Sequence, residues 1–142
     1  MTSISPAIAQ NLPPVTDILQ GAIRPDLIRN EVLADIFEVT ATLNPDQLAL
    51  VFGAQQLSYV ALNAQADQVA SHLLHAGVGP GDVVGLWLPR GIDLLAMQLG
   101  IAKTGAAWLP FDADTPCERI AICLEDAQAV GLVSSEAHRA GF

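Results

Sequence analysis

Two aspartates near the C-terminal end are the first candidates for chemistry. Asp112 and Asp114 follow an apolar run, residues 106–109, and precede a helix start. Ligands of open α/β sheets bind beyond the carboxyl ends of the strands, so carboxylates in this place could hold a cation or a ligand. Aspartate before a helix also serves turns and the helix dipole, and we favour this structural interpretation.

Lys103 is the second candidate because it is the only lysine in the sequence. The phosphate-binding pattern G-x-x-x-x-G-K-[ST] does not surround it. Thr104 and Gly105 follow it and predict the end of a helix, where a lysine side chain meets the negative end of the helix dipole, worth ~0.3–1 kcal/mol. We therefore expect a structural rather than a catalytic role.

The segment GVGPGDVVG, residues 77–85, superficially resembles a glycine-rich phosphate loop. Such a loop follows a strand and opens a helix, whereas these glycines follow a predicted helix and open a predicted strand. A helix C-cap and a turn account for Gly77, Gly79 and Gly81 without a phosphate.

The histidines and cysteines do not form a recognisable site. His72 and His75 lie three residues apart on a predicted helix and could bind a metal, but no third ligand is suitably spaced, so we expect solvated positions. His138 falls in a polar tail. Cys117 and Cys123 lie about two-thirds of a turn out of alignment on one predicted helix, which predicts free thiols. We assign no catalytic, cofactor-binding or metal-binding residue.

Composition limits the function classes. The 142 residues are 51% hydrophobic and carry a net charge of −9, which predicts one folded domain with an acidic surface. That charge disfavours nucleic acid and anionic membranes. No apolar stretch reaches the ~18–20 residues of a spanning helix, and residues 1–14 do not resemble a signal peptide, so we expect a cytoplasmic protein.

The predicted elements fall into three groups. Residues 1–28 are irregular and proline-rich, and we interpret them as a leader or linker before a domain at 29–142. A helix at 30–43 capped by Asn30, a hairpin at 48–57 with its turn at 53–56, and a helix at 58–75 capped by Ser58 follow.

From residue 83 onwards, unbroken apolar runs alternate with helices. The run at 83–88 is typical of a strand buried on both faces. A helix at 92–103, a strand at 106–109 that stops at Pro110, a helix begun by Thr115 with Glu118 at its third position, and a strand at 129–133 come next. This order predicts a three-layer α/β fold with a parallel β-α-β-α-β sheet and a short N-terminal hairpin.

Two segments carry a family resemblance. LSYVAL, residues 57–62, resembles the first core motif, L-[TS]-Y-x-E-L, of the adenylation domains of non-ribosomal peptide synthetases, which are adenylate-forming ligases. IAKTGAAWLPFD, residues 101–112, resembles the second, L-K-A-G-x-A-Y-V-P-I-D, with Thr104 where alanine is usual. WLPFDADTP is similar to the branch near poly-amino-acid synthetases. The resemblance covers residues 30–133, the N-terminal part of the domain.

The resemblance implies a parent reaction and its partners. The parent uses ATP and Mg²⁺ to convert a carboxylate, such as an amino acid, to an acyl-adenylate, and loads it onto the phosphopantetheine of a carrier protein. The family's phosphate loop, substrate pocket and C-terminal lysine would come after residue 142. We therefore expect an inactive fragment without a cofactor of its own, whose sheet edge could mediate self-association.

Two alternatives remain open from the sequence. The chain could be a stand-alone α/β interaction module from a truncated gene. It could also be a fragment of an acyl-CoA-synthetase-type ligase, although the P-F-D ending of the second motif argues against this.

The resemblance also yields a prediction about stability. Ala61 stands where the first motif has glutamate, three residues after Ser58, so a capping box is missing its acidic member. We expect Ala61→Glu to raise the free energy of unfolding by roughly 0.5–1 kcal/mol in a thermal melt. An unchanged or lower stability would contradict this interpretation.

Overall fold

The computed structural model describes residues 22–28 and 30–139. The chain divides into two compact units, residues 1–30 and 31–142. In the first unit the described part is a short 3-10 turn, η1 (Pro25–Leu27), beside an ion pair of 2.6 Å between Arg24 and Asp26. Most of the proposed leader, residues 1–28, lies outside the described residues.

The second unit alternates helices and strands. Its elements are α1 (Leu33–Leu43), β1 (Leu48–Phe52), β2 (Gln55–Ser58), α2 (Tyr59–His75), β3 (Val83–Trp87), α3 (Ile92–Lys103), β4 (Ala107–Phe111), α4 (Cys117–Asp126), β5 (Gly131–Ser134) and α5 (Glu136–Arg139). The predicted hairpin is confirmed: β1 and β2 pair antiparallel around Gly53, whose φ is +59°. Its turn is shorter than predicted, because Gln55 and Gln56 already belong to β2.

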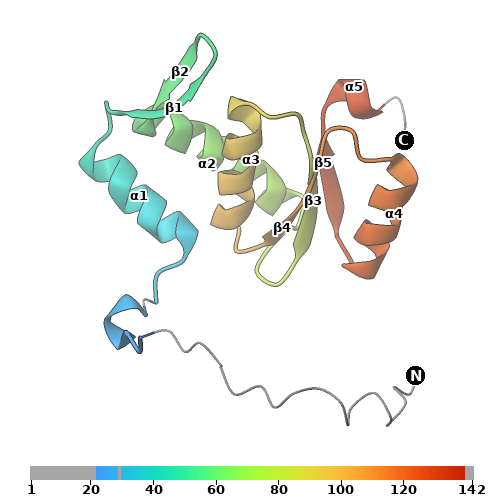
Figure 1. Cartoon of the computed structure of the whole chain (residues 1–142), viewed down its shortest axis with the longest axis horizontal. Helices are drawn as coiled ribbons and strands as arrows, with labels where there is room; N and C mark the ends of the chain where they lie inside the picture. The colour runs from blue at the N-terminus through green and yellow to red at the C-terminus, as the bar shows by residue number, and fades with distance from the viewer. Residues whose placement is uncertain (1–21, 29, 140–142) are drawn as a thin grey trace, which may run out of the picture. The chain divides into compact units, whose positions relative to one another are not determined.

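Three parallel strands form the central sheet. Their order is β4-β3-β5, with Val84 of β3 opposite Trp108 of β4 and Gly131 of β5. Figure 1 shows α2 and α3 on one side of this sheet and α4 on the other. The three-layer α/β prediction is thus confirmed. The middle strand, β3, is buried from Val84 to Trp87, as its unbroken apolar sequence predicts.

The prediction that Pro110 ends its strand is wrong. Pro110 lies inside β4, opposite Leu86 of β3. Proline has no N–H to donate, so it cannot complete the hydrogen bonds of a strand that is paired on both sides. β4 lies at the edge of the described sheet and has a partner strand on one side only. An edge strand therefore accommodates it.

Two predicted helix caps are also wrong. Asn30 lies three residues before the first residue of α1, where the carboxylate of Asp35 instead accepts a hydrogen bond of 3.1 Å from the N–H of Val32. Thr115 does not cap α4, because Pro116 is extended and the helix begins one residue later than expected. The N–H of Thr115 donates to the carbonyl of Asp112 instead.

Two glycines allow the layers to approach closely. A Cβ atom on Gly100 of α3 would lie 2.3 Å from Cγ1 and 2.5 Å from Cβ of Val69 on α2. A Cβ atom on Gly85, in the middle of β3, would lie 2.5 Å from a methyl group of Leu124 on α4. The contact at Gly100 involves Cβ of Val69, so packing between α2 and α3 requires glycine there. At Gly85 the nearest atoms are the ends of leucine side chains, which would have to shift to admit a side chain.

Gly100→Ala tests this packing. Alanine in a helix is favoured over glycine by roughly 0.5–1 kcal/mol, but overpacking a core costs about 1–3 kcal/mol. We expect Gly100→Ala to lower the free energy of urea unfolding by about 1–2 kcal/mol, the sign opposite to that of helix propensity.

Gly79→Ala is the matched control, since an added Cβ there meets nothing within 4 Å and the backbone is not left-handed. We expect it to stay within about 0.5 kcal/mol of the parent. Stabilisation by Gly100→Ala would refute the close approach of α2 and α3.

Candidate functional site

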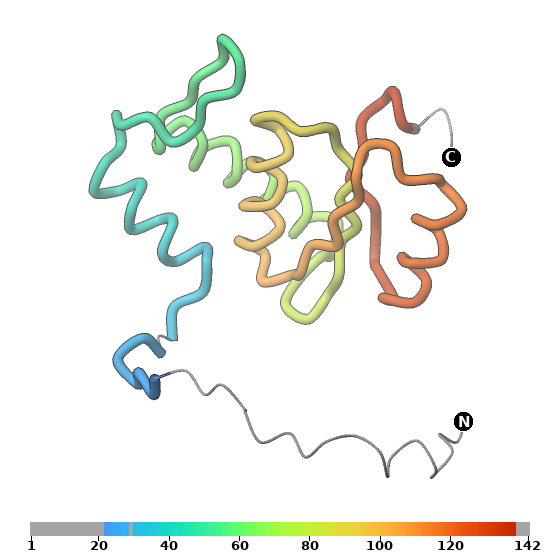
Figure 2. Tube along the Cα trace, viewed as in Figure 1, coloured from blue at the N-terminus to red at the C-terminus, as the bar shows by residue number. Residues whose placement is uncertain are grey.

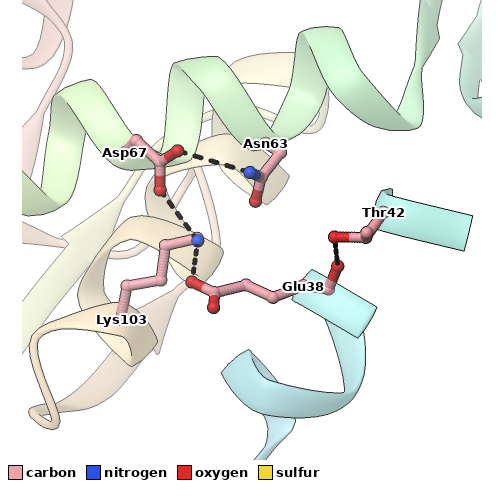
Figure 3. Close-up of polar contacts among 5 residues, drawn as sticks. All are labelled: Glu38, Thr42, Asn63, Asp67 and Lys103. Atoms are coloured by element: carbon pink, nitrogen blue, oxygen red, sulfur yellow. Dashed lines mark hydrogen bonds and ion pairs between the residues drawn. The ribbon is translucent and has the colours of Figure 1, made fainter. Parts of the chain in front are cut away.

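Lys103 lies at the centre of an ion-pair cluster that joins three helices (Figure 3). Its ammonium group is 2.8 Å from a carboxylate oxygen of Asp67 on α2 and also pairs with the carboxylate of Glu38 on α1. The lysine side chain is only 6% exposed, whereas the two acidic side chains are 55–56% exposed. The cluster therefore covers the lysine and leaves the carboxylates in contact with water.

The electrostatics of the cluster keep Lys103 protonated. Burial lowers the pKa of the Lys103 ammonium, but the hydrogen bonds and charges of Asp67 and Glu38 outweigh burial, so the pKa is raised above its ordinary value. A raised pKa is the opposite of what a lysine nucleophile or base needs. Lys103 thus joins α1, α2 and α3 through its side-chain ion pairs, in addition to its place at the end of α3.

Thr104 and Gly105 end α3 immediately after the lysine. The Thr104 hydroxyl donates to the carbonyl of Ile101 (2.7 Å) and accepts from the N–H of Ala106 (3.2 Å), so it links the last turn of the helix to β4. Gly105 has a φ of +82° and packs against Pro80, which a Cβ atom would meet at 2.9 Å. The loops before β3 and β4 thus meet at one end of the sheet (Figure 2).

The glycine-rich segment 77–85 is a helix end followed by a turn. Gly77, with a φ of +90°, follows α2, and Val78 N–H bonds the carbonyl of Leu73 in the glycine-ended helix motif. The N–H of Gly79 donates a hydrogen bond of 2.8 Å to the carboxylate of Asp82. This carboxylate occupies the amide and would repel a phosphate, which agrees with the structural interpretation of the segment.

Asp112 and Asp114 lie at the carboxyl end of the sheet, in the turn after β4. The carbonyl of Asp112 accepts from the indole N–H of Trp87 and from the N–H of Thr115, both at 3.0 Å. Both aspartate side chains are exposed and line an open groove together with Arg90. The contacts of Asp112 are therefore those of a turn that is tied to the end of β3.

The prediction that His138 falls in a polar tail is wrong. It belongs to α5, and its ring stacks on Trp87 with centroids 4.2 Å apart and planes 11° apart. The imidazole Nδ1 is 3.4 Å from the Trp87 carbonyl oxygen. The two residues are 51 positions apart, and only the pairing of β5 with β3 brings them together, so sequence spacing carried no signal for this contact.

The other candidates stay apart. His72 and His75 are exposed on α2, and the Nδ1 atom of His75 is 2.6 Å from the carbonyl oxygen of Ser71. Cys117 and Cys123 are free, half-buried thiols, as predicted. Within residues 22–28 and 30–139, no three His, Cys, Asp or Glu side chains come together as a metal site, and no helix is long and apolar enough to cross a membrane.

Two features of the described residues disfavour the phosphates of ATP. The one glycine-rich turn presents the carboxylate of Asp82, and the buried cation, Lys103, is already paired with two carboxylates. We assign no step of a reaction to these residues.

A match to a known family explains this arrangement. Residues 37–141 match the family described as AMP-binding enzyme, and the chain belongs to it. The predicted resemblance to the adenylation domains of non-ribosomal peptide synthetases is confirmed by relatives and by solved structures.

Among the relatives, Delta-poly-L-ornithine synthetase of Acinetobacter baumannii (strain AB307-0294) is 54% identical over 120 residues, which are 84% of this chain and 9% of that protein. A dimodular nonribosomal peptide synthase of Bacillus subtilis (strain 168) is 41% identical over 104 residues, 73% of this chain and 4% of that protein. The chain thus spans less than a tenth of the length of these relatives.

Solved structures place the chain within the adenylation domain. The NpsA N-terminal subdomain of Klebsiella oxytoca superimposes with a TM-score of 0.69 at 29% identity, over 73% of this chain and 27% of that one. The nonribosomal peptide synthetase FmoA3 superimposes with a TM-score of 0.73 at 34% identity, over 77% and 12%. The chain corresponds to part of the N-terminal subdomain of such an adenylation domain.

Lys103→Met tests the ion-pair cluster. Methionine keeps most of the apolar stem and removes the charge. We expect the free energy of unfolding at pH 7 to fall by about 1–2 kcal/mol, because each carboxylate is half exposed and each pair is screened by water.

The stabilisation by the Lys103 cluster should depend on pH in a defined direction. A folded-state pKa raised above the ordinary value of ~10.4 means that the stabilisation is fully present below that pH and is lost as the pH rises through the higher folded value. The difference in the free energy of unfolding between parent and variant should be constant from about pH 6 to 9 and shrink above pH ~10.4.

Arg119→Met, which removes an exposed cation on α4, is the control for net charge and should lower the free energy of unfolding by less than about 0.5 kcal/mol. Equal costs for the two variants would contradict a specific cluster.

Proposed function

We propose that this chain is the structural frame of the N-terminal subdomain of an amino-acid-activating adenylation domain. The match of residues 37–141 to the AMP-binding family, on a fold that superimposes on the NpsA N-terminal subdomain, carries the proposal. In this role β3 and its helix layers support neighbouring parts of the domain, while Lys103 and the close-packed glycines hold the helices in place.

The reaction of the whole protein is activation of a carboxylate. A carboxylate oxygen of the amino acid attacks the α-phosphorus of ATP, which releases pyrophosphate and forms an acyl-adenylate. The thiol of a carrier-protein phosphopantetheine then attacks the acyl carbon and releases AMP. ATP and Mg²⁺ are cofactors of this parent reaction, and the carrier protein is its partner. The NpsA subdomain has been solved with anthranilyl-AMSN, and NpsA has been fused to ThdA as an adenylation-PCP di-domain, which supports both expectations.

Three narrower points are part of the proposal. L-Ornithine is the first substrate to test, because the relative at 54% identity is a Delta-poly-L-ornithine synthetase. The outer edges of β4 and β5, which have no partner among the described strands, could mediate self-association. The third point is that the protein is located in the cytoplasm. The acyl-CoA-synthetase and interaction-module alternatives gain no support from any observation above.

ATP–pyrophosphate exchange with L-ornithine tests the proposal. We expect the 142-residue chain alone to show no exchange above background. A chimera that joins residues 1–133 to the following part of the Delta-poly-L-ornithine synthetase adenylation domain should show exchange. Amino-acid-dependent exchange by the isolated chain, or a folded chimera without exchange, would refute the proposed role as a frame.

The same chimera separates a structural from a catalytic Lys103. Because its pKa is raised and its charge is paired, we expect Lys103→Met to keep exchange within a few-fold of the parent at temperatures where it remains folded. A loss of more than about 100-fold in a folded variant, roughly 2.7 kcal/mol of transition-state stabilisation, would make Lys103 catalytic.

A further inference from the structure

Helix α1 has apolar residues on two opposite faces. On its inward face Ala34 and Ala41 are buried, and the ring centroid of Phe37 lies 5.9 Å from that of Tyr59 on α2. Glu38, which pairs with Lys103, holds the same side of the helix against α3. This face accounts for the docking of α1 onto the rest of the unit.

The opposite face carries larger apolar side chains. Ile36, Val39 and Leu43 follow each other in α1 at intervals of 3 and 4 residues, so they lie on one face of the helix. Val32, the extended residue just before the helix, precedes Ile36 by four positions and is grouped with them. In chain order from Val32, their exposed fractions are 60%, 42%, 59% and 73%. At 3.6 residues per turn, Val39 and Leu43 lie about half a turn from Ala34 and Ala41. We call these four residues the outer stripe of α1.

An outer stripe of this kind is unusual for a helix on a protein surface. A surface helix normally has one apolar face and one polar face, and a helix that is apolar on both sides is normally buried between two partners. Exposed apolar side chains scattered singly need no explanation, but four in line at helical spacing form a contiguous surface. The pattern indicates that a second element covers α1.

The charges beside the stripe define the chemistry of that element. Glu31 and Asp35 are exposed at the start of α1, and the helix contains no lysine, arginine or histidine. A second copy packed parallel to α1 would bring these carboxylates together, and any second copy would add to a net charge of −9. We propose that the outer stripe of α1 is a docking surface for an amphipathic helix whose apolar stripe is flanked by lysine or arginine residues.

A synthetic peptide tests the proposal with the 142-residue chain. The probe is a fluorescein-labelled helical peptide of about 18 residues with leucines at the same helical spacing as the stripe and lysine flanks, and the comparison peptide has glutamate flanks. We expect saturable one-to-one binding of the lysine peptide in fluorescence anisotropy. The glutamate peptide should bind at least tenfold more weakly.

Matched variants locate the binding surface. The double variant Val39→Gln with Leu43→Gln should weaken binding of the lysine peptide at least tenfold and leave the urea midpoint unchanged. Ile122→Gln, an equally exposed apolar position on α4, should change binding less than twofold. Glu31→Gln should weaken binding of the lysine peptide severalfold and leave binding of the glutamate peptide unchanged or stronger.

Other results overturn the proposal. Equal binding to the double variant, or equal binding of both peptides, would show that the stripe or its flanking charges do not select the partner. A lower urea midpoint in the double variant would show that the face is already packed. Sedimentation as a dimer that the double variant abolishes would assign the stripe to a second copy. Much tighter binding after removal of residues 1–21 would assign it to the chain's own N-terminal segment.

Discussion

The close approach of the layers at β3 is the constraint on which the rest of the structure depends. β3 is buried from Val84 to Trp87, so both faces of the strand must be covered by helices at short range. Gly85 lets α4 approach one face, and on the other side Gly100 lets α3 lie directly against α2. A side chain at Gly100 would push α2 and α3 apart, and one at Gly85 would force Leu124 of α4 and Leu132 of β5 to shift. Either change would disturb the dense packing beside the core.

Electrostatics take a secondary but specific part in this arrangement. The chain has a single lysine and a net charge of −9, and that lysine lies where three helices meet. Two half-exposed carboxylates surround it, so the cluster keeps its charges partly solvated and avoids the full cost of a buried ion pair. Fixing α1 in this way orients the helix with Ala34, Phe37 and Ala41 inward and the outer stripe outward.

Most elements of the fold could be predicted from sequence, while several boundaries could not. The unbroken run of β3 and the helical spacing of α2 are local patterns, and both were predicted correctly. The strand end at Pro110 was predicted wrongly because the effect of a proline depends on whether β4 has one neighbour or two, which the sequence of β4 does not contain. The caps at Asn30 and Thr115 failed because side chains and backbone conformations a few residues away decided where each helix begins.

Sequence alone was enough to establish the family, the order of elements and the structural nature of the glycine-rich segment, because motifs, apolar periodicity and glycine positions act over short distances. It also limited the chemistry, since the only lysine and the scattered histidines lacked suitable neighbours along the chain. The three-dimensional arrangement was needed to find that Lys103 bridges three helices, that His138 stacks on Trp87, and that α1 presents a second apolar face. These features join residues many positions apart, so they depend on how strands pair and helices cross, which no local pattern records.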